Sequence, residues 1–520
     1  MVTDITSLNG VVEMFLEALL HAVTAKSLLL VTAGALLGVV IGALPGLTIT
    51  MTTALLVSLT YGWQTWDALA LIMGAYVGSM SGGAISAVLL NIPGMPSACA
   101  TCFDGYPMAK RGEGATAIGM ARTASLFGSL VGMLFLGFTA PIIANFALKF
   151  GPFEFFYLIL MGLTMISSLS GGSFVKGMIA GLIGIFLSIV GMDPVWGTPR
   201  FTFGNFQLMR GLNFIAVLIG LMGMSELLIQ ASKKQTNVGM LSVVKKEVIK
   251  LSELWRMKWL ILQSSMIGIW IGALPGIGQT IATLAAYDVA KRTVKNPKIP
   301  FGEGAIEGVV APEVADNACI GGALIPMLAL GLPGDSVTAI LLGAFMMHGI
   351  RPGPLFMSTN PDLFWFIVIM GSLAAVSAYF VVRLGNNLFP RILLVKTNLL
   401  LPVIGALCVV GAYATEGNMF DVVVMLIFGM IGFVLRLMNF PVSSIIIGFV
   451  LGQMADSELR RALILSKNIP SFIKMSLSRP ISLILIFVII LQLLLTNRRF
   501  KGIIKGFWAQ IFGNNKKAAM

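Results

Sequence analysis

The chain has 520 residues, of which 57% are hydrophobic and only 11% are charged, and its mean hydropathy is +0.93. So few polar side chains cannot cover a soluble protein of this size, which excludes a soluble globular fold. The net charge of +13 does not indicate nucleic acid, because the basic residues cluster beside apolar runs, as the positive-inside rule describes. We therefore expect an all-α polytopic membrane protein in a lipid bilayer, with no nucleic-acid partner.

The N-terminus does not resemble a cleavable signal peptide. Its first ten residues, MVTDITSLNG, carry Asp4 but no Lys or Arg, so the basic region of such a peptide is missing and we expect the segment to stay attached. Residues 11–23 are apolar but short, and they hold Glu13, Glu17 and His21. This pattern predicts a short helix at the membrane interface.

Apolar runs that could form helical spans recur along nearly the whole chain, and a span needs about 20 such residues. Some runs are too long for one span and others too short, so we expect about 11 to 13 membrane elements, including hairpins that do not cross. The runs cover residues 27–44, 67–92, 116–148, 153–171, 174–192, 212–232, 258–274, 318–347, 363–384, 396–414, 419–438, 441–455 and 479–496.

Two apolar runs end in the same sequence, GALPG, at residues 42–46 and 272–276. Further on, GGAISAVLLNIPG (82–94) is similar to GGALIPMLALGLPG (321–334). Two matched motifs in the same order predict an internal duplication. The predicted parts are a first transporter repeat (1–232), a basic cytoplasmic linker (233–257), a second transporter repeat (258–496) and a basic cytoplasmic tail (497–520).

The charges of corresponding loops predict that the two repeats have opposite orientations. In the first half, the loop after GALPG has no Lys or Arg, whereas Lys110 and Arg111 follow NIPG. In the second half, four basic residues between 291 and 298 follow GALPG, and only Arg351 follows GLPG. Loops that exchange their charge bias lie on opposite sides of the membrane. We therefore expect two inverted-topology repeats with broken helices or re-entrant hairpins.

Gly-Pro breaks inside a membrane leave backbone groups unpaired, and such breaks form substrate and ion sites in transporters. The alternative is that small residues at these positions only allow helices to pack closely. The predicted substrate-binding residues are Ser81, Gly82, Gly83, Asn91, Pro93, Gly94, Ser97, Asn317, Pro333, Gly334, Asp335 and Ser336. The predicted cation-binding residues are Pro45, Gly46, Thr48, Thr50, Pro275, Gly276, Gly278, Gln279, Thr280, Glu313 and Asp316.

Acidic residues at membrane depth need a reason, because burying their charge is costly. Glu313 and Asp316 border an apolar run, and Asp335 directly follows LPG. Neutral oxygen ligands with a nearby carboxylate suit a hard monovalent cation such as Na⁺. The alternative is that these acids cap helices, with one helix beginning near Pro312, since Pro and acidic residues favour a first turn.

Metal, redox and enzymatic functions have little support in the sequence. The four cysteines include one CxxC pair, Cys99 and Cys102, but no second Cys or His cluster accompanies it. No nucleophile and base stand in a recognisable arrangement. We therefore expect a protein that is not an enzyme and that has no cofactor beyond a coupling ion.

The motifs GALPGLTITMTTALL, YVGSMSGGAISAVLLNIPGMPSACATCFDGYPMAKRGEG and EGVVAPEVADNACIGGALIPMLALGLPGDSVTAILLGA resemble the large membrane subunit of the tripartite tricarboxylate transporter family. The resemblance implies an elevator-type transporter of the bacterial inner membrane. It also implies a small integral membrane subunit and a periplasmic substrate-binding protein as partners. Asp316 stands where the family usually has Asn, Met80-Ser81 replaces a common Tyr-Gly, and LGQMADSELRRAL departs from the usual pattern.

The leading hypothesis is cation-coupled uptake of tricarboxylates or related small carboxylates, with Na⁺ as the expected ion. A proton-coupled transporter of another carboxylate is the alternative, followed by a channel, for which the sequence lacks matched polar rings. Arg122 is a candidate for attracting the anion, although a long basic side chain can also reach the membrane surface. A homo-oligomer stays an open alternative.

Overall fold

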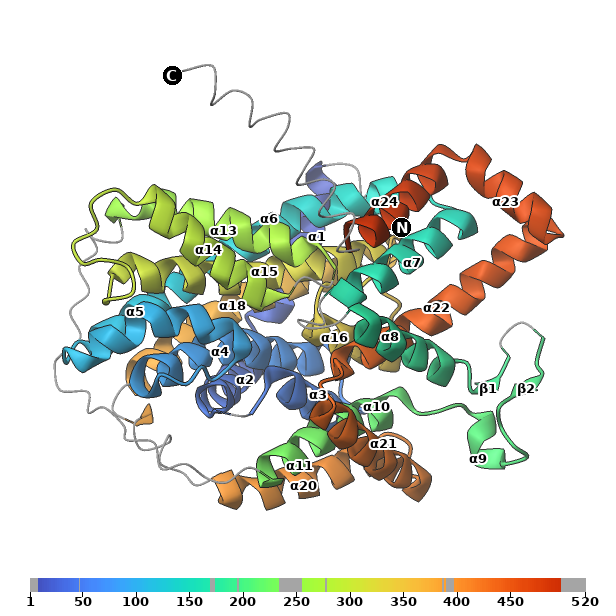
Figure 1. Cartoon of the computed structure of the whole chain (residues 1–520), viewed down its shortest axis with the longest axis horizontal. Coiled ribbons are helices and arrows are strands. Elements are labelled where there is room, and N and C mark those ends of the chain that lie inside the picture. Colours follow the sequence, from blue (N-terminus) through green and yellow to red (C-terminus); the bar gives the residue numbers. More distant parts are fainter. Residues whose placement is uncertain are drawn as a thin grey trace, which may run out of the picture.

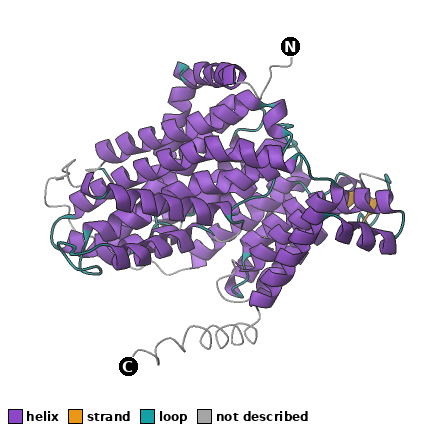
Figure 2. Cartoon of the chain, turned by 90° about the horizontal axis from the view of Figure 1, so that it is seen from above, coloured by secondary structure: helices purple, strands orange, loops and turns teal. Residues whose placement is uncertain are grey.

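A computed structural model describes residues 8–45, 47–168, 174–193, 196–232, 255–275, 278–385, 388–389 and 397–496. Figure 2 shows these residues as a stack of helices joined by short loops. A single antiparallel hairpin of two strands is present in this part of the chain, in which β1 (Gly191–Met192) pairs with β2 (Pro199–Arg200). The prediction of an all-α polytopic membrane protein is confirmed.

Eight helices within the described residues are long and apolar enough to cross a membrane. Five shorter apolar helices accompany them, together with one helix pair bent by 97°. The expected 11 to 13 elements therefore include short helices as well as full spans. The eight long helices are Ala25–Ala43, Thr65–Leu90, Gly114–Ala147, Phe214–Ser232, Ile306–Leu330, Pro361–Gly385, Met419–Leu437 and Val442–Ser466.

The first described element is the predicted short helix, α1 (Leu8–Ala22), which packs mainly against α18 (Pro361–Gly385). His21 stacks on Trp66 with ring centroids 4.7 Å apart. Close by, Lys26 forms an ion pair of 2.5 Å with Asp67, which ties the starts of α2 and α4 together. We call this end of the molecule the Lys26 end.

The first GALPG separates α2 (Ala25–Ala43) from α3 (Ile49–Leu59), which turns back toward the Lys26 end. Proline cannot donate a helical hydrogen bond, so Pro45 favours an end to α2. Thr48 then starts α3, since its hydroxyl accepts a hydrogen bond from the backbone N–H of Met51 over 3.3 Å. The two helices form a re-entrant hairpin.

The helix that follows, α4 (Thr65–Leu90), runs parallel to α2 and in close contact with it. A Cβ atom at Gly38 would clash with the backbone of Ala75, and one at Gly82 would clash with the backbone of Val39. Glycine at these positions lets the two backbones approach, as in other tightly packed membrane helices. The predicted packing role of small residues therefore applies to Gly38 and Gly82.

The second GALPG produces the same arrangement from the opposite end of the molecule. It separates α13 (Lys258–Ala273) from α14 (Gln279–Thr293), and α15 (Ile306–Leu330) then packs parallel to α13. A Cβ atom at Gly268 would clash with the backbone of Ala315. Gly278 precedes α14 with φ of 81°, a conformation that favours glycine.

The two long helices α4 and α15 both end at a residue in the left-handed conformation. Asn91 has φ of 56° and Gly331 has φ of 74°. After the first break, a short turn, η1 (Pro96–Ala98), leads into α5 (Cys99–Lys110). After the second break the chain continues as α16 (Ser336–Met347). Each half therefore contains two breaks, as the repeated motifs predicted.

The long apolar run at residues 318–347 is divided between α15 and α16 by the break after Leu330. One alternative for the second half was wrong. The helix that carries Glu313 and Asp316 begins at Ile306 rather than near Pro312, so these acids lie inside α15 and do not cap it. Asp335 does cap a helix, since it forms a capping box with Thr338 at the start of α16.

At the end opposite Lys26, the two halves are joined through Asp104 of α5. Its Oδ1 accepts hydrogen bonds from the backbone N–H groups of Gly302, Gly304 and Ala305 over 2.7 to 2.8 Å, and its Oδ2 accepts one from the hydroxyl of Tyr287 over 2.8 Å. Arg111 also donates to backbone carbonyls in this loop. We call this end the Arg111 end.

The helices α2–α5 and α13–α16 make up what we call the broken-helix unit, and α6 (Gly114–Ala147) and α18 (Pro361–Gly385) pack along it. Most of the remaining helices form a flanking unit, which lies on the right and along the bottom of Figure 1. Its elements are α7 (Pro152–Ser168), α8 (Phe174–Ser188), α9 (Phe206–Met209), α10 (Phe214–Leu218), the π-helical segment η2 (Ile219–Met224), α11 (Ser225–Ser232), α20 (Thr397–Ala414), α21 (Met419–Leu437), α22 (Val442–Ser466), α23 (Ile469–Ser478) and α24 (Pro480–Thr496). One further short helix, α17 (Phe356–Thr359), precedes α18.

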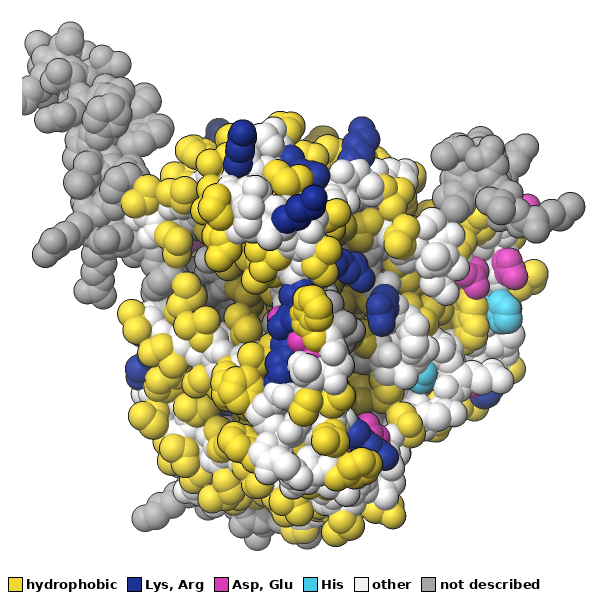
Figure 3. Space-filling view, turned by 90° about the vertical axis from the view of Figure 1, so that its right-hand side faces the viewer, with side chains coloured by type: hydrophobic (Ala, Val, Ile, Leu, Met, Phe, Trp, Pro, Cys, Tyr) yellow, Lys and Arg dark blue, Asp and Glu magenta, His cyan; other side chains and the backbone are white. Residues whose placement is uncertain are grey.

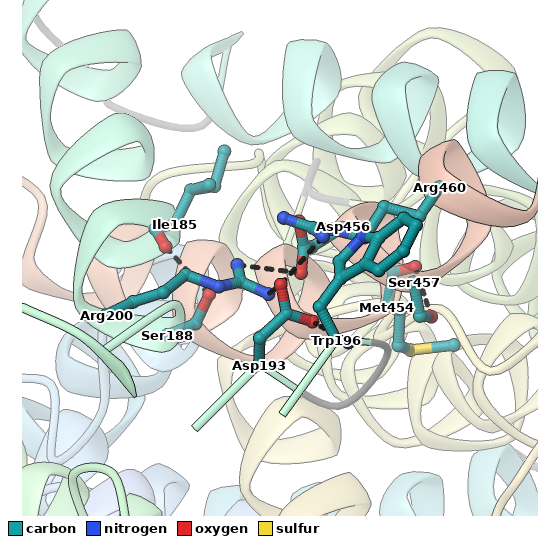
Figure 4. A network of polar contacts seen from close by, with 9 residues as sticks. All are labelled: Ile185, Ser188, Asp193, Trp196, Arg200, Met454, Asp456, Ser457 and Arg460. Carbon is teal, nitrogen blue, oxygen red and sulfur yellow. Dashed lines mark hydrogen bonds and ion pairs between the residues drawn. The ribbon is translucent and has the colours of Figure 1, made fainter. Parts of the chain in front are cut away.

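A network of charged residues fastens the β-hairpin to α22 (Figure 4). Arg200 pairs with Asp193 over 2.7 Å and with Asp456 over 3.1 Å, and Arg460 pairs with Asp193 over 2.7 Å. Burial lowers the pKa of Arg200, but its hydrogen bonds with the two carboxylates outweigh this effect and raise the pKa above its ordinary value. Figure 3 shows a central column of basic and acidic side chains, bordered by hydrophobic surface, on this side of the molecule.

Candidate functional site

The four breaks of the broken-helix unit meet at one cavity of about 230 Å³. Segments from both repeats line it, and the first two turns of α22 line it from the flanking unit. The residues that line the cavity are Thr48, Ile49, Thr50, Met95, Pro96, Ser97, Gly278, Gln279, Thr280, Asp335, Ser336, Val337, Ser443 and Ile447.

Three helices begin at this cavity, because Thr48, Gly278 and Asp335 are the N-cap residues of α3, α14 and α16. A helix N-terminus carries partial positive charge and backbone N–H groups without helical partners. Such ends favour negatively charged groups. The hydroxyls of the threonines and serines in the lining add neutral hydrogen-bond donors, so the cavity suits a small polar anion.

One side of the cavity is held together by a chain of hydrogen bonds between the two repeats. The hydroxyl of Tyr76 on α4 donates to Oδ2 of Asp335 over 3.0 Å. Gln279 at the start of α14 donates to the Tyr76 hydroxyl over 3.4 Å. Asp335 also accepts from the backbone N–H of Thr338 over 2.7 Å. The first repeat therefore positions the polar residues of the second.

A second set of hydrogen bonds lies behind the cavity, around the middle of α15. Ser97, which lines the cavity, donates to Oδ2 of Asp316 over 3.0 Å. Thr101 on α5 donates to Glu313 over 2.5 Å. Ser129 on α6 donates to Oδ1 of Asn317 over 3.2 Å. The carboxylate of Asp316 is therefore separated from the cavity only by the hydroxyl of Ser97.

Glu313, Asp316 and Asp335 are all buried, and in the described part of the chain none of them forms an ion pair with Lys, Arg or His. Three buried carboxylates without a basic partner carry a large desolvation cost if all are charged. A bound proton or metal cation would remove this cost. The carboxylates therefore lie beside the cavity without a compensating charge from the described residues.

Eight of the predicted site residues line the cavity, namely Thr48, Thr50, Ser97, Gly278, Gln279, Thr280, Asp335 and Ser336. Glu313, Asp316 and Asn317 lie behind it in the hydrogen-bonded set around α15. Ser81, Gly82, Gly83, Asn91, Pro93, Gly94, Pro333, Gly334, Pro45 and Pro275 do not line it. Gly46 and Gly276 lie outside the described residues.

Three predicted glycines that do not line the cavity, Gly82, Gly94 and Gly334, serve close packing instead. A Cβ atom at Gly94 would clash with the backbone of Gly42, and one at Gly334 would lie 2.7 Å from the Cα atom of Ala323. The breaks bring the chain back against the hairpins so tightly that only glycine fits. These residues shape the site without facing it.

Sequence reasoning missed several residues of the site. Ser443 and Ile447 belong to α22, in an apolar run with no motif, so no local signal connects them with the breaks. Tyr76 lies in a long apolar helix and becomes informative only through its contact with Asp335. Arg122, in contrast, does not line the cavity: it is buried and lies 4.9 Å from the ring of Tyr379.

The fold defines a polytopic membrane protein in which paired helix breaks surround a cavity, as expected of a permease. The sequence matches the model of the tripartite tricarboxylate transporter TctA family over residues 28–447. The chain therefore belongs to this family.

Two curated relatives come from Agrobacterium vitis. An uncharacterized 52.8 kDa protein in the TAR-I ttuC' 3' region is 35% identical over 418 residues, which cover 79% of this chain and 82% of the relative. An uncharacterized protein in the TAR-II ttuC' 3' region is 38% identical over 205 residues, which cover 39% of this chain and 83% of the relative. No solved structure matches the chain.

Membership of this family identifies the chain as the large subunit of a tripartite transporter. The family is one of transporters and not of enzymes. Its systems include a small membrane subunit and a periplasmic binding protein, which are the expected partners of this chain. The family and the apolar helices together place the protein in the bacterial inner membrane.

Proposed function

We propose that this permease takes up tricarboxylates or related small carboxylates at the cavity between the four breaks, driven by a coupled cation. The observation that carries the proposal is that three helix N-termini and several hydroxyl groups meet there. A carboxylate group can accept hydrogen bonds from such donors and gains from the positive ends of the helix dipoles. The cavity offers these interactions to each end of a small diacid or triacid.

Cation coupling is supported by the buried carboxylates around α15. The charge of an anionic substrate would add to that of Glu313, Asp316 and Asp335, so uptake needs compensating positive charge nearby. The ligands in this region are carboxylate, hydroxyl and carbonyl oxygens, which suit Na⁺. A proton is the alternative coupling ion, since it neutralises a buried carboxylate equally well.

We also infer an inverted-topology duplication from the matching helix contacts. The pair α2 and α4 begins at the Lys26 end, and the pair α13 and α15 begins at the Arg111 end, with glycine contacts at corresponding positions. The basic residues 233–257 and 497–520 then make the Arg111 end cytoplasmic. In an elevator-type transporter the broken-helix unit would move against the flanking unit.

The orientation can be tested by labelling single cysteines with a membrane-impermeant reagent in intact cells. The four native cysteines are first replaced, and one cysteine is then introduced in one of two loops, at Gly62 of the Lys26 end or at Gly302 of the Arg111 end. A Cβ atom at either position meets nothing within 4 Å, so neither substitution causes a clash. Both glycines have positive φ, of 75° and 90°, which strains any other residue, so each variant is first checked for wild-type uptake. We expect labelling from outside at position 62 and labelling at position 302 only after the cells are opened. The reverse pattern would contradict the orientation.

The function is tested by uptake of radioactive carboxylates into membrane vesicles that contain the complete tripartite system. Replacing Na⁺ by choline at fixed pH should abolish accumulation if Na⁺ is the coupling ion. Uptake that persists in choline but collapses with the proton gradient would identify the proton. Uptake that neither saturates nor depends on an ion gradient would indicate a channel and contradict the proposal.

A matched pair of variants connects uptake with the cavity. Gln279→Ala removes a side chain that lines the cavity, whereas Gln263→Ala removes one on the same hairpin that bonds Thr293 outside it. We expect uptake to fall by about tenfold in Gln279→Ala, the equivalent of one lost hydrogen bond of about 1.4 kcal/mol. Gln263→Ala should transport like the wild type. Equal uptake by both variants would remove this cavity from the mechanism.

A further inference from the structure

The three buried carboxylates at the cavity (Asp335) and behind it (Glu313 and Asp316) differ in how their oxygens are satisfied. Both oxygens of Glu313 accept a hydrogen bond, from Thr101 over 2.5 Å and from Ser125 over 3.2 Å. Both oxygens of Asp335 also accept, one from Thr338 and the other from Tyr76. The protein itself therefore satisfies two of the three groups.

Asp316 is different. Its Oδ2 accepts a hydrogen bond from Ser97, but its Oδ1 has no hydrogen-bond partner among the described residues, although the side chain is only 2% exposed. A buried carboxylate oxygen without a partner is costly, and such groups persist where a ligand completes them. The unsatisfied atom points to a ligand that accepts electron pairs, which is a cation.

We propose that Oδ1 of Asp316 binds the coupling monovalent cation, Na⁺ or a proton, and that Ser97 connects this site with the substrate cavity. This inference deepens the proposed function and rests on it. Ser97 lines the cavity and donates to the other oxygen of the same carboxylate. A change in charge at Asp316 therefore alters a hydrogen bond of a residue that faces the substrate.

The repeat explains why this chain has one such site and not two. Tyr76 precedes Asp316 by 240 residues, the same spacing that relates Gly94 to Gly334. Each of these two side chains is hydrogen-bonded to a residue that follows a break in the other repeat. Tyr76 donates to Asp335 of the second repeat, and Asp316 accepts from Ser97 of the first. The first repeat places a neutral phenol where the second places a carboxylate, so we expect one cation at these paired positions.

The cation and the substrate should strengthen each other's binding. With Asp316 charged and uncompensated, its negative charge repels an anion in the cavity, and this repulsion is strong where water is excluded. A bound cation removes the repulsion and raises the affinity for a carboxylate. By linkage, the carboxylate must raise the affinity for the cation by the same factor.

The test is equilibrium binding of radioactive sodium to the purified permease, with and without citrate, together with proton uptake on citrate addition in weakly buffered solution. Asp316→Asn keeps the shape of the side chain and can still accept from Ser97. Asp421→Asn is the matched control, because Asp421 is also buried and bonds Asn213 in the flanking unit. Ser97→Ala keeps the carboxylate but removes the connection to the cavity.

We expect the wild type and Asp421→Asn to bind sodium alike, and Asp316→Asn to need at least about tenfold more sodium for half-saturation. Ser97→Ala should bind sodium, with a smaller gain in affinity on adding citrate. If the ion is a proton, the wild type takes up protons with citrate and Asp316→Asn does not.

The proposal is overturned if Asp316→Asn binds sodium and takes up protons as the wild type does, or if the wild type does neither. Binding of citrate and of a series of other dicarboxylates and tricarboxylates to the same preparations tests the proposed function separately. A wild type that binds sodium through Asp316 but binds no carboxylate would retain the cation site and refute carboxylate transport.

Discussion

The hydroxyl of Tyr76 donates a hydrogen bond of 3.0 Å to Oδ2 of Asp335, and the two residues are 259 positions apart in the sequence. Tyr76 lies inside α4 of the first repeat, and Asp335 caps α16 of the second. A break in one repeat is thus stabilised by a side chain of the other. The cavity is therefore lined by both halves and needs both to form.

Tyr76→Phe should therefore impair transport while leaving the fold intact. The substitution leaves one oxygen of buried Asp335 without its donor, which costs about 1 to 3 kcal/mol. We expect carboxylate uptake in vesicles to fall by about tenfold or more, with little change in the amount of folded protein. Tyr61→Phe, at an exposed position, is the control. Normal uptake by Tyr76→Phe would show that the bond is not needed.

Asp104→Asn should destabilise the protein rather than alter its substrate preference. Asp104 is fully buried and accepts four hydrogen bonds from the second repeat. The amide keeps Oδ1, but without the negative charge its three bonds from backbone N–H groups weaken, and its Nδ2 cannot accept the fourth bond from Tyr287. We expect a loss of about 2 to 4 kcal/mol, seen as a lower midpoint of thermal unfolding in detergent. Tyr287→Phe removes one of the four bonds and should cost less. An equal loss from both variants would contradict the role given to the backbone bonds.

The glycine contacts between hairpins and long helices predict a large effect of a single methyl group. Gly268→Ala would place a Cβ atom against the backbone of Ala315, whereas a Cβ atom at Gly181 meets nothing within 4 Å. We expect Gly268→Ala to destabilise the protein by about 1 to 3 kcal/mol and Gly181→Ala to have almost no effect. The measurement is the midpoint of thermal unfolding of each variant, which should be lower for Gly268→Ala than for Gly181→Ala. Equal midpoints would argue against close packing at Gly268.

The charged network in Figure 4 should hold the β-hairpin on α22. Asp193→Ala removes the carboxylate that Arg200 and Arg460 share, so the hairpin should open more often and exchange its amide hydrogens faster. Glu458→Ala breaks a pair with Arg461, whose side chain is 63% exposed, and such exposed pairs contribute little. Hydrogen exchange over residues 189–212 that is the same in both variants would contradict this account.

Motifs in the sequence were sufficient to predict the breaks but not the cavity. GALPG ends helices because proline and glycine do so wherever they occur, and the prediction of two hairpins followed from that local chemistry. Local chemistry could not show that Gly82 and Gly94 serve helix packing whereas Thr48 and Gln279 line the cavity. Only the packing of the whole chain decides which of these residues face the cavity.

The start of α15 shows the limit of local signals in another way. Pro312 and the acids after it resemble a helix start, but the helix begins at Ile306 because neighbouring helices bury and support its first turns. Pro312 gave a misleading local signal, whereas Ser443 gave no local signal at all. It carries no motif, and it reaches the site only because α22 begins beside the breaks.

The central claim is that the cavity between the four breaks binds a carboxylate. The most direct test is the thermal unfolding midpoint of the purified permease across a series of dicarboxylates and tricarboxylates in Na⁺, for the wild type, Ser443→Leu and Ser457→Leu. Ser443 lines the cavity, and Ser457 lies on the same helix outside it. A ligand that binds the folded state must raise its stability. We predict that at least one carboxylate raises the midpoint of the wild type and of Ser457→Leu but not that of Ser443→Leu; a shift that persists unchanged in Ser443→Leu, or no shift with any carboxylate, would contradict the claim.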